Sequence, residues 1–150
     1  MLRRRRRLLT IAVPAALLFL AVSFGVARFL SVEGRERDAI TTLLEAETTG
    51  DPGKVAAGLD GCDAACRARI ATFLPRLAGP GEVKIARLDS KTAYTFGTAQ
   101  GWTRVVWVRG LNGRPVVQCV LVRREGSPLT GRSVSLRRLG APLADNEGSC

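Results

Sequence analysis

The chain has 150 residues, a formal net charge of +10, four cysteines and no histidine. The absence of histidine excludes Ser-His-Asp and Cys-His catalysis and every metal site that needs an imidazole. Six of the 23 basic residues lie in residues 1–30, where there is no acid, and aromatic residues make up only 5% of the chain. The net charge is therefore a poor argument for nucleic-acid binding, which uses aromatic side chains to stack bases.

An uncharged stretch of twenty residues, Leu8–Ala27, directly follows five arginines, Arg3–Arg7. As a helix, a stretch of this length spans about 30 Å, the thickness of a bilayer core. Arginine clusters favour the cytoplasmic side of a membrane. The sequence therefore predicts a basic cytoplasmic tail over residues 1–7, a single transmembrane helix over residues 8–30, and an extracytoplasmic remainder in the cell membrane.

A cleaved signal peptide is the alternative for this segment. Gly25-Val26-Ala27 fits a small-x-Ala cleavage site, and Arg5–Leu9 loosely matches a twin-arginine export signal. The apolar run is longer than the roughly 7–15 residues that are usual in a signal peptide, which favours the uncleaved anchor. A mature chain beginning at Arg28 would identify the signal peptide instead.

The remainder is expected to form one small domain over residues 31–140 and a tail over residues 141–150. Its charge is unevenly distributed, because residues 33–63 contain eight acids whereas residues 84–138 contain eleven bases and two acids. Such a basic half could bind anionic lipid headgroups or envelope polymers, although a solvated surface has the same composition. Arginine far outnumbers lysine, as in bacteria with GC-rich genomes.

Four cysteines, Cys62, Cys66, Cys119 and Cys150, fall on the predicted outer side, where disulfides form. Four cysteines allow three connectivities. A Cys66–Cys119 bridge would join a helix to the sheet, but we slightly prefer Cys62–Cys66 with Cys119–Cys150, which requires Cys62 to lie at a frayed helix start. The Cys-x-x-x-Cys spacing and the missing histidine argue against a metal or thioredoxin-like site.

Three helices are expected first. One covers residues 35–49, where Ile40, Leu43, Leu44 and Glu47 follow helical spacing with Ala39 and Ala46 alongside. It either begins at a Ser31 cap or continues the membrane helix, and Gly50 ends it. A second runs from an Asp51 cap and Pro52 to Leu59. A third covers Cys62–Leu77, is capped by Asp60 or Asp63, and stops at Gly79-Pro80-Gly81.

After Gly81 the pattern changes to strands, expected at Val83–Asp89, Thr103–Gly110, Pro115–Arg124 and Ser133–Leu139. Thr92–Gly97 is either a further strand or a continuation of the first one across a turn at Ser90-Lys91. Asn112-Gly113 predicts a type I′ turn between two of these strands. With these two residues as the loop, Val108 faces Val117, Val106 faces Cys119, and Trp102 faces Arg123.

This register places Val105, Trp107, Gln118 and Val120 on one face of the hairpin. Both faces are apolar near the centre, so one must pack on the helices and the other is a second buried surface or a partner contact. Tyr94, Val105, Trp107 and Val120 are the candidate ligand or partner face, although a tryptophan such as Trp107 is more often a core residue.

Helices over Ala39–Glu47, Pro52–Leu59 and Cys62–Leu77, followed by strands joined at Asn112-Gly113, indicate an α+β fold. This order resembles the nuclear transport factor 2-like (cystatin-like) superfamily, whose cone packs a long helix into a curved antiparallel sheet. Membrane-anchored versions include the mammalian-cell-entry-associated membrane proteins and assembly components of type IV secretion machines. The resemblance implies helices packed on a curved antiparallel sheet of about four strands.

The resemblance also implies an envelope accessory or scaffold that binds a partner protein or an apolar ligand, with envelope proteins or a second copy as partners. Enzymes of the superfamily place an acid/base residue inside the cone. Here Tyr94 is the sole tyrosine, and Asp60 and Asp89 fit cap and turn positions. We therefore expect no catalytic, cofactor or metal residues. The alternatives are an isomerase-like or dehydratase-like small-molecule enzyme and a module that binds anionic polymers or headgroups.

Overall fold

The structure is a computed structural model that describes residues 2–92, 97–110, 113–127, 131–144 and 150, with side chains except at residues 2–11, 28–33, 127 and 131. It is an α+β fold in which helices pack on a four-stranded antiparallel sheet of order β1-β2-β3-β4. This general class is as expected. The elements are α1 (Leu2–Thr48), α2 (Pro52–Ala57), α3 (Ala64–Phe73), the 3-10 helix η1 (Leu74–Arg76), β1 (Val83–Ser90), β2 (Ala99–Arg109), β3 (Val116–Ser127) and β4 (Gly131–Leu139).

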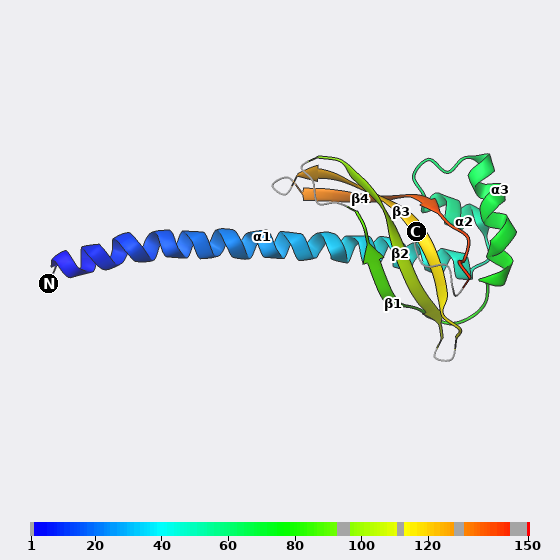
Figure 1. Cartoon of the computed structure of the whole chain (residues 1–150), viewed down its shortest axis with the longest axis horizontal. Helices are drawn as coiled ribbons and strands as arrows, with labels where there is room; N and C mark the ends of the chain where they lie inside the picture. Colours follow the sequence, from blue (N-terminus) through cyan, green and yellow to red (C-terminus); the bar gives the residue numbers. More distant parts are fainter. Residues whose placement is uncertain (1, 93–96, 111–112, 128–130, 145–149) are drawn as a thin grey trace.

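Helix α1 is continuous from the apolar segment into the domain (Figure 1). Of the two alternatives for its start, continuation through Ser31 is the one observed, and Gly50 ends the helix with a φ of 73°. Figure 1 shows the first part of α1 projecting away from the sheet and the other helices. Large apolar side chains between Val13 and Val26 are 53% to 71% exposed there. Within the described residues, no helix combines the length and hydropathy that a membrane crossing requires.

The two short helices are capped by aspartates. Asp51 accepts a hydrogen bond from the Gly53 amide, and Asp63 accepts one from the Cys66 amide, both at 2.8 Å. Asp63 is thus the cap of α3, and α3 begins two residues later than expected. The helix tightens to a 3-10 turn at Leu74–Arg76 because Pro75 has no amide hydrogen to continue the α-helical ladder.

The strand register between β2 and β3 differs from the expected one by two residues. Val106 pairs with Val117, and Trp102 pairs with Leu121 rather than Arg123. The chain leaves β2 at Gly110, which has a φ of 67°, and a Cβ on Gly113 would lie 2.1 Å from the Arg109 carbonyl oxygen. The observed register is therefore not the one that a two-residue turn at Asn112-Gly113 would impose.

A shift of two residues keeps every side chain on its expected face, because side chains alternate along a strand. Val105, Trp107, Gln118 and Val120 accordingly share the face that packs on α1. The predicted turn residue Asn112 lies outside the described residues, as does most of the strand predicted at Thr92–Gly97.

The hydrophobic core lies between this inner face and the C-terminal half of α1. Ile40, Leu43 and Leu44 of α1 are at most 1% exposed there. The preferred disulfide pairing is confirmed, with Cα–Cα distances of 5.3 Å for Cys62–Cys66 and 5.7 Å for Cys119–Cys150. Cys62 precedes α3, which relieves the strain of a bridge within a helix.

Candidate functional site

Three consecutive residues of α1, which we call the collar, attach the helix to the sheet: Arg35, Glu36 and Arg37. Arg35 Nη1 donates a 2.8 Å hydrogen bond to the Arg132 carbonyl of β4, and Arg37 Nη2 donates a 3.0 Å bond to the Ile85 carbonyl of β1. These strands are the two edges of the sheet. The collar therefore holds α1 across the whole width of the sheet.

Glu36, between the two arginines, points into the interior. Its Oε1 accepts a 2.6 Å bond from Thr103 Oγ1, and its Oε2 accepts a 3.0 Å bond from Arg124 Nε and forms an ion pair with Arg124 Nη2. Glu36 and Thr103 are fully buried and Arg124 is 1% exposed. Ser90 Oγ lies 3.2 Å from Arg124 Nη2. The group is a buried, hydrogen-bonded ion pair whose geometry fixes the rotation of α1 on the sheet.

A second buried polar group lies near the C-terminal end of α1. Trp107 Nε1 donates a 2.7 Å bond to Gln118 Oε1, and Gln118 Nε2 donates to Glu47 Oε1 at 3.2 Å and to the Gly140 carbonyl at 3.3 Å. Burial raises the pKa of Glu47 from 4.5 to about 8, although the Gln118 hydrogen bond opposes this shift. Glu47 Oε2 has no hydrogen-bond partner among the described residues. At neutral pH this carboxyl is therefore mainly protonated.

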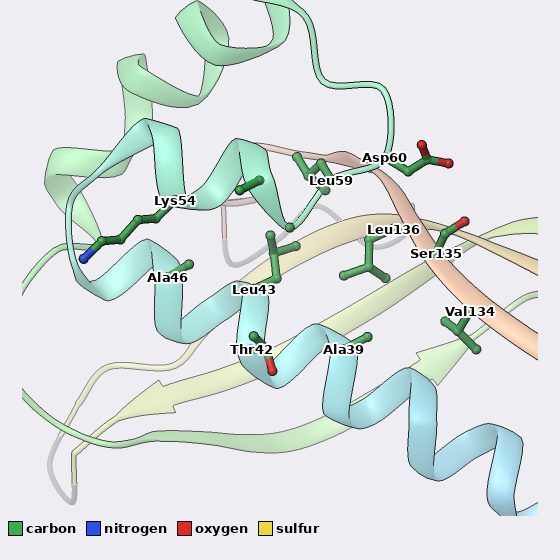
Figure 2. Close-up of a pocket in the computed structure, with 12 residues that line it drawn as sticks. Ala39, Thr42, Leu43, Ala46, Lys54, Leu59, Asp60, Val134, Ser135 and Leu136 are labelled. Carbon is green, nitrogen blue, oxygen red and sulfur yellow. The ribbon is translucent and has the colours of Figure 1, made fainter.

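An apolar groove of about 630 Å³ lies between α1, α2 with the turn after it, and β4 (Figure 2). Its volume falls in the range of small-molecule sites, roughly 300–1,000 Å³. Small and aliphatic side chains line it, among them Ala39, Leu43, Ala46, Leu59, Val134 and Leu136. The two helices approach closely beside it, since a Cβ on Gly58 would lie 3.1 Å from Leu43 Cδ1.

The polar groups at the groove are mostly engaged. Asp60 pairs with Arg137, and the Asp60 amide donates a 2.7 Å bond to the Leu136 carbonyl on the free edge of β4. The Arg132 carbonyl, two rungs further along this edge, accepts the bond from Arg35. Carbonyls of the edge strand therefore already have donors on both sides of Val134. The groove offers apolar side chains to a ligand rather than an open strand edge to an extended peptide.

The residues predicted as a ligand or partner face are not at this groove. Val105 and Val120 are fully buried and Trp107 is 1% exposed, so the structure corrects that expectation: these three are core residues packed against α1. Tyr94 lies outside the described residues. The groove had one indication in the sequence: the small residues Ala39 and Ala46 lie beside the apolar stripe of α1, and both line the groove.

No group of three or more acidic or cysteine side chains in the described ranges could hold a metal ion. All four cysteines form disulfides. Comparisons of the chain with protein-family models and curated proteins, and of its fold with solved structures, found no match. The groove, the collar and the two buried polar groups are therefore interpreted from their own geometry.

Proposed function

We propose that this chain is a single-pass membrane protein of the bacterial envelope whose extracytoplasmic domain binds an apolar ligand in the groove between α1, α2 and β4. The observation that carries the proposal is the continuity of α1. One helix contains the exposed apolar stretch, the collar and the core residues of the domain. The domain would then stand at a fixed distance from the membrane, as suits an accessory or scaffold protein. A cone-like fold is compatible with helices packed on an antiparallel sheet.

The anchoring rests on the sequence of residues 8–27 and on the exposure of the side chains described there. Leu17, Leu18 and Phe19 are 61% to 71% exposed to solvent. Apolar surface of this extent on an isolated helix is favourably removed from water by a bilayer. The arginines before it orient the N-terminus toward the cytoplasm.

Anchoring predicts that the full chain stays in the membrane fraction after carbonate extraction. Leu18→Asp combined with Val22→Asp should release the protein, because each aspartate near the helix centre costs about 3 kcal/mol on the insertion scale. Thr42→Asp combined with Thr49→Asp places the same charges on exposed positions of the domain and should leave the protein in the membrane. Extraction of the unchanged chain, or a mature protein that begins at Arg28, would contradict the anchor.

The groove predicts site-specific labelling by a small apolar photoreactive probe such as an adamantyl diazirine. Mapping by mass spectrometry should place the label on peptides that contain Ala46 and Leu136. Ala57 is exposed and lines the groove, so Ala57→Trp should fill the space and lower labelling about tenfold, the equivalent of about 1.4 kcal/mol.

Ala68→Trp is the matched control for this experiment. Ala68 is also an exposed alanine, but it lies on α3 and does not line the groove. Its replacement should leave the labelling unchanged. Equal loss in both variants, or label spread evenly over the domain surface, would contradict a ligand site in the groove.

A catalytic role is the second candidate, because a buried carboxyl with a raised pKa is typical of a general acid or base. Glu47 has this property, but it lies in the core against Gln118 and is not among the residues that line the groove. We therefore propose a binding role without a cofactor. An isomerase or dehydratase activity lost in Glu47→Gln would favour the enzyme instead.

A further inference from the structure

The sheet face turned away from α1, which we call the outer face, carries an apolar stripe framed by basic side chains. Because side chains alternate along a strand, the neighbours of the buried Thr103 and Val105 point outward. The stripe consists of Trp102, Val106, Val108, Val117 and Leu121. The frame consists of Lys84, Arg87, Arg123 and Arg138, and Arg104 lies within the stripe between Trp102 and Val106. Figure 1 shows β1, β2 and β3 crossing in front of α1, and the C-terminus lies on this same face through the Cys119–Cys150 bond.

Some basic side chains of the outer face pair with acids, and others do not. Asp89 pairs with Arg87 at 2.8 Å, and Glu125 pairs with Arg123 at 2.5 Å. The Nε groups of Arg104 and Arg123 are shielded from solvent and have no hydrogen-bond acceptor in the described part of the chain. Arg104 and Arg138 form no ion pair with any described residue and are at least partly exposed, so their guanidinium groups can pair with an incoming carboxylate.

The direction of the outer face limits which partner can reach it, and this step rests on the proposed anchoring. If α1 crosses the membrane, its axis runs roughly along the membrane normal. The sheet packs against the side of α1, so the outer face looks sideways, parallel to the membrane plane. Lipid headgroups lie at the end of the domain nearest the apolar segment and do not face this surface.

We propose that the outer face binds an acidic, partly apolar protein segment that lies beside the domain. Binding of a purely anionic polymer would use only the basic side chains and would not explain the apolar stripe. Tryptophan and arginine together are typical of the energetic centre of protein interfaces, with a charged rim around them. Trp102 lies between Arg104 and Arg123 in the strand register and is the expected anchor of the contact.

The test uses the full chain in nanodiscs of zwitterionic lipid and three fluorescent probes: a random copolymer of glutamate and tyrosine, polyglutamate of equal length, and dextran sulfate. The copolymer should bind about tenfold more tightly than polyglutamate, because the tyrosines contact the apolar stripe. Arg104→Glu and Trp102→Ala should each weaken copolymer binding by about tenfold. Arg67→Glu reverses an exposed charge on α3 and should have no effect.

Equal binding of all three probes would overturn the proposal and identify a surface for anionic polymers. An effect of Arg67→Glu as large as that of Arg104→Glu would also overturn it, because binding would then follow net charge. A spin label at Arg138→Cys should be accessible to a water-soluble nickel chelate, and preferential access of oxygen would show that the outer face lies on lipid. Loss of membrane association alone would contradict the anchoring, while copolymer binding could still be measured on the purified chain.

Discussion

Glu36→Gln is expected to lower the free energy of unfolding by about 3–5 kcal/mol, the usual cost of removing one partner of a buried ion pair. Glu36 is fully buried and accepts from both Thr103 and Arg124. Without the carboxylate, the Arg124 guanidinium stays in the core with its charge no longer balanced by Glu36. Chemical denaturation of the full chain in one detergent, followed by circular dichroism, measures the loss.

Glu45→Gln is the matched control, since Glu45 lies on the same helix but is exposed. It should change stability by no more than a few tenths of a kcal/mol, as surface substitutions usually do. The double variant Glu36→Leu with Arg124→Met removes both charges and should be more stable than Glu36→Gln alone. If Glu36→Gln cost no more than Glu45→Gln, the ion pair would not be what holds α1 on the sheet.

The stability of the chain should fall as the pH rises from about 4.5 to about 8, because of Glu47. Burial raises the pKa of this carboxyl from 4.5 to about 8 in the folded state. In that window the folded protein keeps a proton that the unfolded chain has lost, so rising pH favours unfolding. Each pH unit costs about 1.4 kcal/mol, and the whole window costs roughly 5 kcal/mol.

Glu47→Gln isolates this effect from the other titrating groups. The variant keeps an oxygen that can accept the bond from Gln118 Nε2 but has no proton to lose. Its stability relative to the unchanged chain should rise steadily between pH 5 and pH 8, whereas Glu45→Gln should show no such trend. A constant difference between Glu47→Gln and the unchanged chain would contradict a raised pKa in the core.

Local features of this fold could be predicted from the sequence because neighbouring residues determine them. Asp51 with Pro52 specifies a helix start, and Gly50 accepts the positive φ that ends α1. Alternation along the strands places Val105 and Trp107 on one shared face of the sheet, and a two-residue shift of register leaves them there. The Cys62–Cys66 bond requires Cys62 to lie outside the helix, and the Asp63 cap places it there.

The features that were missed depend on residues far apart in the chain. Asn112-Gly113 suggests a two-residue turn, but the pairing of β2 with β3 differs by two residues from the register that this turn would impose. Glu36 and Arg124 are 88 residues apart, and charged residues are rarely buried, so nothing in the sequence distinguishes this pair from surface charges. The groove combines three elements and appears only once α2 packs against α1.

The most direct test of the central claim, that one rigid helix joins the apolar segment to the domain, is a distance between spin labels at Ser23→Cys and Glu45→Cys in nanodiscs. Both positions are exposed on α1, and the native cysteines are all in disulfides. A continuous helix places the two backbone sites about 33 Å apart, at 1.5 Å per residue. We predict a single narrow distribution near this distance, and a broad one reaching well below it would reveal a hinge before the collar and contradict the account.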